Sequence, residues 1–256
     1  MTDEKTIEFE PFVKFVVEFH NNSMTYAKLL RTKVQKVDAF SSHDIELIEE
    51  AFLIKHVAEW ETFIQNIFAY CIAIDTTALG DHLDLDLSKT IRFDNAYAIL
   101  NGLNFFTISS TDELKGMAKK IITEKNNPFP KFDKKFLNRI DEVYTLRNYI
   151  AHKSTRSKKR LAKMYKDKYQ INSFVSPGNF LRQIERDEKF GDCLRSDLYY
   201  GAFMTIAVDI WKHLDAKSHK FVFEDDSTLE GFVKGVAKMN FIFDRITEEN
   251  NLNPIK

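Results

Sequence analysis

Three side chains that can act together on a phosphodiester lie within one short stretch of the sequence: Arg147, Asn148 and His152. The guanidinium of an arginine is a planar, permanently charged donor that fits phosphate oxygens, and an asparagine amide orients a phosphate or a neighbouring side chain by hydrogen bonding. Histidine serves as a general acid or base near neutral pH. These residue types have the chemistry that cleavage of an RNA backbone without a metal ion needs: a base deprotonates the 2'-hydroxyl, an acid protonates the leaving 5'-oxygen, and positive donors stabilise the phosphate.

The helix expected to carry these residues runs from about Lys134 to His152. Its apolar stripe runs through Phe136, Ile140, Val143 and Ile150. Arg147 stands where the helical period calls for another apolar residue. At about 100° per residue, Asn148 and His152 stack four positions apart beside Arg147, while Tyr149 points away. Because a buried guanidinium is costly unless it is paired, Arg147 indicates either an ion pair or a function.

The alternative to a reactive site is a structural arginine together with an ordinary histidine. Glu61, on an expected helix from about 41 to 74, is a carboxylate that could pair with Arg147. Glu61 borders the apolar stripe of that helix next to Trp60, which is expected in the core. Glu61 therefore either holds Arg147 or His152 in place as part of a catalytic site, or forms a helix–helix ion pair of purely structural importance.

The string Arg147-Asn148-Tyr149-Ile150-Ala151-His152 resembles the Arg-Asn-x-x-Ala-His motif of the HEPN superfamily, whose all-α domains include many ribonucleases of toxin–antitoxin and phage-defence systems. A second feature is similar to the HEPN branches called RiboL-PSP-like, in which a long upstream helix carries a Trp-Glu pair followed by apolar residues. Here Trp60 and Glu61 stand about 90 residues before the motif. The resemblance covers roughly residues 41–216.

The resemblance implies an antiparallel helical bundle with extra helices, acting as a metal-independent endoribonuclease whose products carry 2',3'-cyclic phosphate ends. It also implies a homodimer with a composite active site, since two such helices generally face each other and one histidine does only half of the proton transfer. The biological setting implied is a toxin or phage-defence effector, which a partner protein can neutralise. The alternative is a HEPN fold used as a non-catalytic binding or dimerisation module.

One form of control is not expected. Some HEPN toxins extend the motif to His-x-Tyr, and the tyrosine accepts a nucleotidyl group that silences them. In this chain Lys153 and Ser154 follow His152.

A basic segment from 153 to 168 directly follows the motif. It holds eight Lys or Arg against Asp167, a net charge of +7, although the whole chain has a formal net charge of −1. Such a patch is suited to steering an RNA backbone towards His152. The residues expected to bind RNA are Lys153, Arg156, Lys158, Lys159 and Arg160. A solvated helix face or a mobile loop is the alternative.

No other motif indicates a cofactor or metal. The chain has no Gly-rich phosphate loop and no His-Glu-x-x-His box. Asp81, His82, Asp84 and Asp86 cluster as metal ligands can, but they stand in a poorly patterned polar stretch, so a solvated loop is expected there.

The composition predicts an all-α fold. Among 256 residues there are only 8 Gly and 5 Pro, and no linker separates domains, so one helical domain over 1–256 is expected. Further helices are expected over about 11–37, from 110 to before 126, over 194–214 and, as an amphipathic C-terminal helix, over 228–246. Residues 75–110 are left unassigned.

A cytoplasmic protein is expected. No secretory signal is visible at the start, and the longest apolar run, Ile67 to Ile74, is far shorter than the roughly 20 residues that cross a membrane. Cys71 and Cys193, each placed in an apolar helical pattern, are expected to be buried free thiols.

Overall fold

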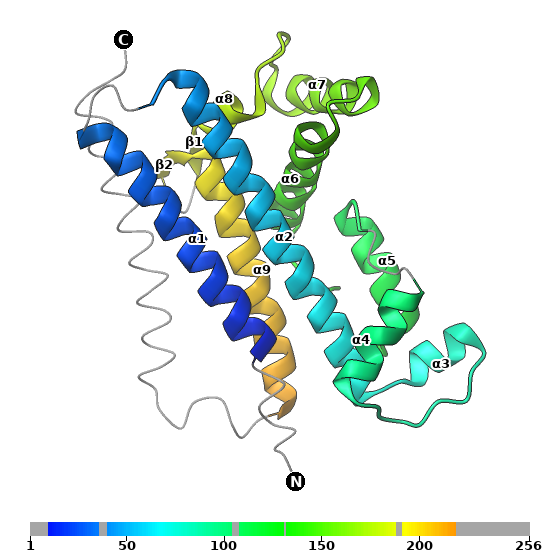
Figure 1. Ribbon diagram of the computed structural model, residues 1–256. Coiled ribbons are helices and arrows are strands. Elements are labelled where there is room, and N and C mark those ends of the chain that lie inside the picture. Colours follow the sequence, from blue (N-terminus) through cyan, green and yellow to red (C-terminus); the bar gives the residue numbers. More distant parts are fainter. Residues whose placement is uncertain (1–9, 36–39, 104–107, 131, 188–190, 219–256) are drawn as a thin grey trace.

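The computed structural model describes residues 10–35, 40–103, 108–130, 132–187 and 191–218 (Figure 1). The elements, in chain order, are α1 (Glu10–Gln35), α2 (Ser42–Ile74), α3 (Thr77–Leu83), α4 (Phe93–Gly102), α5 (Thr111–Ile121), α6 (Lys134–His152), α7 (Thr155–Tyr169), α8 (Pro177–Leu181), β1 (Ile184–Asp187), β2 (Gly191–Leu194) and α9 (Arg195–Ser218). In this part of the chain the strands form a single antiparallel pair. The predicted all-α class is therefore confirmed.

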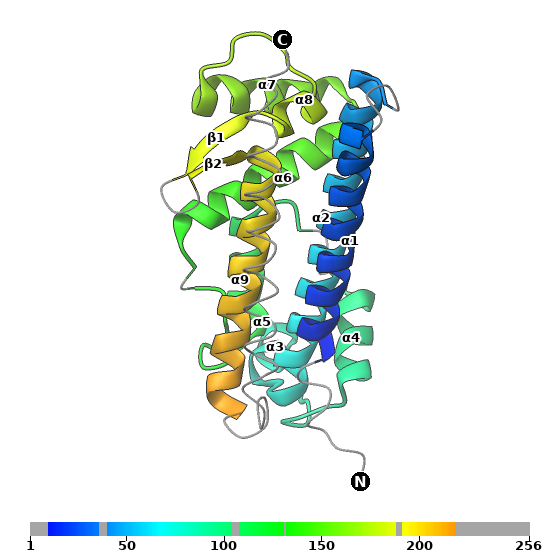
Figure 2. The same ribbon diagram turned by 90° about the vertical axis from the view of Figure 1, so that its left-hand side faces the viewer.

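Three long helices, α1, α2 and α9, lie side by side and form the body of the molecule (Figures 1 and 2). Helix α6 packs against both α2 and α9. Helices α3, α4 and α5 gather at one end of this body, and α7, α8 and the β1–β2 hairpin lie at the other (Figure 2). The end of α6 that carries the Arg-Asn-His motif points towards α7 and away from α3.

Aromatic side chains fill the core between the long helices. Trp60 is fully buried, as predicted, and its ring lies 5.1 Å from that of Phe203 on α9. Phe15 of α1 stacks on Phe63 of α2 with ring centroids 4.6 Å apart. Because fully burying a side chain of this size contributes roughly 1.5–3 kcal/mol, these contacts hold α1, α2 and α9 together.

Capping residues begin several helices where the sequence predicted. Ser41 caps α2 and forms a capping box with Asp44, since the serine side chain accepts from the Asp44 N–H and the Asp44 carboxylate accepts from the Ser41 N–H. The Ser110 side chain caps α5 by accepting from the Glu113 N–H, without a capping box. Helix α6 has the predicted bounds, Lys134 to His152.

Other expectations need correction. The unassigned stretch 75–110 contains α3 and α4, and the basic segment after His152, left open between a helix face and a loop, forms the regular helix α7. Ser176 is the N-cap of α8. Cys193 lies in β2 and not in a helix, although both cysteines are buried free thiols as predicted. The predicted helix 228–246 falls outside the described residues.

No helix in the described part is by itself both long and apolar enough to cross a membrane; α2 and α3 together meet that length and composition but join at 95°.

A buried polar cluster interrupts the apolar core between α1, α2 and α9. Glu49 is fully buried and accepts a hydrogen bond from the Tyr26 hydroxyl. Burial raises the pKa of Glu49 to about 7, against the hydrogen bond from Tyr26 and the charge of Arg182, which both lower it. Burial and the nearby Glu49 likewise raise the pKa of Asp197. The folded protein thus prefers Glu49 protonated at mildly acidic pH.

Exchanging Glu49 for glutamine is expected to stabilise the protein at alkaline pH. A carboxyl whose pKa is raised on folding contributes stability that is complete below its ordinary pKa of 4.5 and is lost as the pH rises through about 7. Glutamine still accepts the Tyr26 hydrogen bond and does not ionise, so the gain should reach roughly 2–3 kcal/mol above pH 8 and vanish near pH 4. Urea denaturation across this pH range measures it, and parallel pH profiles for the two proteins would contradict it.

Candidate functional site

The structure brings Glu61 of α2 together with Arg147 and Asn148 of α6. A guanidinium nitrogen of Arg147 lies 3.5 Å from a carboxylate oxygen of Glu61, and the other donates to the Asn148 side-chain carbonyl at 3.1 Å. The side chains of Arg147 and Glu61 are 33% and 27% exposed. The apolar stripe of α6 therefore leaves the core at Arg147, and the guanidinium is oriented at the surface and not sealed inside.

The modest burial of this ion pair limits its contribution to stability. Partly exposed pairs contribute about 0–1 kcal/mol, because water screens the charges and the long side chains lose freedom. Both N–H donors of the Asn148 side-chain amide remain available, since the bond to Arg147 uses the carbonyl oxygen. Arg147 and Asn148 thus present N–H donors on one surface.

Burial, partly opposed by the charge of Arg147, raises the pKa of Glu61. Removing Arg147 would remove the opposing charge, so the ionised form of Glu61 depends on this arginine. The pairing that the sequence suggested between Glu61 and Arg147 is present, and it serves both the catalytic and the structural interpretation of Glu61.

His152 is not joined to the other three residues. It is the last residue of α6, is exposed, and has no hydrogen-bond or ion-pair partner among the residues that the structure describes. Asn148 lies four positions earlier, so the two side chains share one face of the helix. The imidazole therefore stands free beside the oriented Arg147–Asn148 pair.

Tyr144 belongs to this site although the sequence analysis did not single it out. Its phenol is 4% exposed, and its pKa is raised by burial first and by the charge of Glu61 second. Tyr144 lies three positions before Arg147 and four before Asn148, the spacing that places side chains on one helix face. This spacing is the feature of the sequence from which Tyr144 could have been predicted as part of the site. Tyr144 lies on the core side of the Arg147–Glu61 pair and is too buried to contact a substrate.

A sharp turn links the site to the basic segment. Lys153 adopts the left-handed conformation with φ 46° and donates its N–H to the Tyr149 carbonyl, which ends α6. Ser154 then caps α7 through the Ser157 N–H. Because only these two residues separate the helices, α7 begins directly beside His152.

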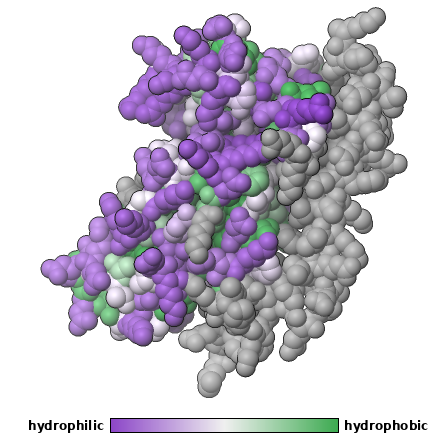
Figure 3. All heavy atoms as spheres, turned by 180° about the vertical axis from the view of Figure 1, so that it is seen from behind, coloured by the Kyte–Doolittle hydropathy of each residue, from purple (hydrophilic) through white to green (hydrophobic). Residues whose placement is uncertain are grey.

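Helix α7 is amphipathic. Its buried side consists of Ser157, Leu161, Met164 and Tyr165. All five predicted RNA-binding residues are exposed: Lys153, Arg156, Lys158, Lys159 and Arg160. Hydrophilic side chains accordingly gather over this end of the molecule, at the upper left in Figure 3. The basic segment is therefore one solvated face of an ordered helix, and not a loop.

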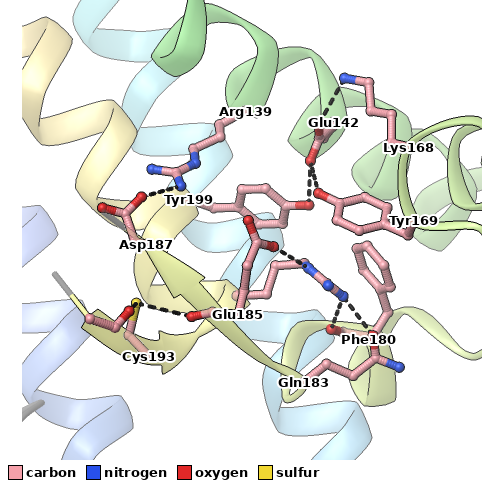
Figure 4. Close-up of polar contacts among 12 residues, drawn as sticks. Arg139, Glu142, Lys168, Tyr169, Phe180, Gln183, Glu185, Asp187, Cys193 and Tyr199 are labelled. Atoms are coloured by element: carbon pink, nitrogen blue, oxygen red, sulfur yellow. Dashed lines mark hydrogen bonds and ion pairs between the residues drawn. The ribbon is translucent and has the colours of Figure 1, made fainter. Parts of the chain in front are cut away.

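A buried polar network fixes α7 against α6 (Figure 4). The carboxylate of Glu142, on α6, accepts hydrogen bonds from Lys168 at 2.8 Å, Tyr169 at 2.6 Å and Tyr199 at 2.7 Å. Lys168 and Tyr169 end α7, and Tyr199 belongs to α9. Lys168 was counted in the basic segment, but its charge is neutralised here, and the network sets the angle at which the rest of α7 leaves α6.

A separate group of ion pairs ties α6 to the hairpin. Asp187 of β1 accepts from Arg139 at 2.7 Å and pairs with Lys135 at 2.9 Å. A buried ion pair that loses one partner costs about 3–5 kcal/mol, so these residues hold the helix that carries the site.

Comparison with protein-family models, with curated proteins and with solved structures finds no match to this chain. The HEPN resemblance stays a prediction from the residues quoted above.

Among the described residues, no three His, Cys, Asp or Glu side chains are grouped so that they could hold a metal ion. Of the acidic stretch considered earlier, Asp81 and His82 lie in the last turn of α3, and Asp84 is its left-handed C-cap. The expected loop is thus partly a helix end.

Proposed function

We propose that this chain is a metal-independent endoribonuclease of HEPN type. The observation that carries the proposal is the surface formed by Arg147, Asn148 and His152: a guanidinium paired with Glu61, a free amide donor, and an exposed imidazole three residues before a basic helix. Arg147 is one-third exposed, so its guanidinium is accessible to a bound phosphate.

The chemistry follows from these groups. Arg147 and the Asn148 amide bind the non-bridging oxygens of the scissile phosphate and stabilise the charge that grows on them. His152 takes the proton of the 2'-hydroxyl, whose oxygen attacks the phosphorus, or gives a proton to the departing 5'-oxygen. The products are a 2',3'-cyclic phosphate and a free 5'-hydroxyl, so no water is consumed and no metal or cofactor is required.

A second copy of the chain completes the proton transfer. One histidine performs only one of the two proton steps at a time, so the proposed enzyme is a two-fold homodimer with both Arg147–His152 segments near the symmetry axis. The motif resemblance supports this assembly, as it supports a role as a toxin or phage-defence effector acting in the cytoplasm and subject to a neutralising partner protein.

Incubating the purified protein with total RNA in EDTA tests the proposal. We expect cleavage with 2',3'-cyclic phosphate ends, detected by end-specific ligation. Arg147→Lys keeps the charge but loses the planar fork, so cleavage should slow by roughly tenfold to a thousandfold. Arg92→Lys, at a side chain that is 83% exposed before α4, is the matched control and should cleave at the parent rate.

Two outcomes would contradict the proposed ribonuclease function. Activity that appears only with an added divalent metal would exclude the proposed mechanism. Binding of RNA without cleavage by the parent protein would favour the non-catalytic binding module.

A further inference from the structure

An exposed aromatic ring lies against α6 and α7, the helices that carry the candidate site and the basic segment, and is not used by the chemistry above. Phe174, in the connection between α7 and α8, is 44% exposed. A single exposed apolar residue is ordinary on a protein surface. The surroundings of Phe174 are not ordinary, because its ring contacts a tyrosine and a lysine, two residue types that commonly bind nucleic acids.

Two contacts hold the ring in place. Tyr149 of α6 meets it edge-on, with ring centroids 5.4 Å apart. The ammonium of Lys158, on α7, lies 4.8 Å from the ring centroid. Tyr149 precedes His152 by three residues, less than one helical turn, so the ring is tied to the helix that carries the imidazole. The aromatic surface is therefore already ordered, and a ligand stacking on it loses little freedom of the protein.

Phe174 also forms one wall of an open groove of about 370 Å³ between α7 and the following connection. Its lining combines apolar, cationic and hydrogen-bonding groups: Phe174, Ile171, Lys163, Lys166, Asn172 and Ser173. Asp167 is the acidic residue in this lining, and the two lysines outweigh it. An apolar floor with an amide, a hydroxyl and ammonium groups at the edge matches a planar base attached to a phosphate.

We infer that Phe174 is the stacking platform for an unpaired nucleobase, and that the α7 groove is a base-binding subsite next to the cleavage site. The base replaces Lys158 over the ring, and the released ammonium moves to a backbone phosphate, where its long stem allows it to reach. A base can stack there only when it is free of its partner strand, so the subsite selects unpaired RNA. This inference rests on the proposed function for its biological role but concerns binding alone.

Binding of a labelled, fully 2'-O-methylated single-stranded RNA tests the subsite separately from cleavage, because this probe lacks the attacking hydroxyl. Phe174→Ala should raise the Kd roughly fivefold to a hundredfold, the equivalent of about 1–3 kcal/mol of stacking. The salt dependence of binding should not change, since no charge is removed. Phe174→Trp should restore binding. The same strand annealed to its complement should bind more weakly and should not respond to Phe174→Ala.

Two matched variants separate stacking from other effects. Leu85→Ala truncates an apolar side chain that is 55% exposed just after α3, at the other end of the body, and should leave the Kd unchanged. Lys163→Gln with Lys166→Gln should reduce the salt slope by up to about two phosphate contacts.

Each outcome bears on one proposal. A Phe174→Ala variant that binds the strand as the parent does overturns the subsite and leaves the enzyme untouched if the parent cleaves RNA. If the unmodified protein binds RNA through Phe174 but never cleaves it, the proposed ribonuclease function is wrong and the subsite stands. If it neither binds nor cleaves RNA, both proposals are wrong. A lower molecular mass of Phe174→Ala by light scattering, with unchanged RNA affinity, would assign the ring to a contact between protein chains and overturn the subsite.

Discussion

Replacing His152 with alanine is expected to reduce RNA cleavage at least about a hundredfold, because general acid–base groups contribute 10²–10⁴ to rate. The imidazole is exposed at the last position of α6 and has no polar partner among the described residues, so its loss disturbs no packing. The free energy of unfolding should change by less than about 0.5 kcal/mol, as for other surface substitutions. Activity and stability therefore separate cleanly at this position.

Cleavage of an end-labelled RNA in EDTA, with urea denaturation of the same preparations, measures both quantities. His43→Ala is the control, since His43 is an exposed histidine in the first turn of α2, far along the chain from the motif. The control should cleave at the parent rate. If folded His152→Ala cleaves as fast as the parent, the proposed site is wrong.

Gly178→Ala is expected to have a large effect on stability. A Cβ at Gly178 would lie 2.5 Å from both the Cα and the carbonyl oxygen of Glu46, closer than atoms can approach. Because these atoms belong to the backbone, no side-chain rotation relieves the clash, and α8 must shift away from α2. This shift also breaks two hydrogen bonds between the start of α8 and α2: Ser176 to Glu46, at 2.5 Å, and the Gly178 N–H to Glu50, at 3.3 Å. We expect a loss of about 1–3 kcal/mol or more.

Thermal and urea denaturation of Gly178→Ala and Gly116→Ala test this contact. Gly116 lies in the middle of α5, and a Cβ there meets nothing within 4 Å. Its exchange should stabilise the protein by about 0.5–1 kcal/mol, because glycine is the more flexible residue in the unfolded chain. Equal effects at both positions would show that helix propensity, and not the approach of α8 to α2, governs Gly178.

The helices that the sequence predicted well are those with local signals. The Ser41–Asp44 capping box lies within four residues, and the bounds of α6 follow from apolar spacing within one helix. Helix α7 was left open because its charged residues dominate the composition and its buried side is short. The β1–β2 hairpin has only four residues in each strand, too few for alternation to be recognised.

The candidate site was predicted only in part, because some of its contacts join residues that are far apart in the sequence. Arg147 broke a local period and was visible in the sequence, and Glu61 was a reasonable partner on a predicted helix. The partners of Glu142 are 26, 27 and 57 residues away, so nothing local identifies them. Phe174 could not be singled out either, since its contacts with Tyr149 and Lys158 depend on the angle between α6 and α7.

The packing of α6 against α9 has a consequence for the order in which a ribosome makes the chain. Helix α2, with Glu61, and helix α6, with Arg147, are synthesised first, but α9 is the last described element to emerge. At about 5–20 residues per second, α6 waits for several seconds without α9, one of the two long helices that it packs against. An incomplete chain therefore holds Arg147 opposite Glu61 through the contact of α6 with α2 alone, and the packing of α9 completes the support of this surface after release.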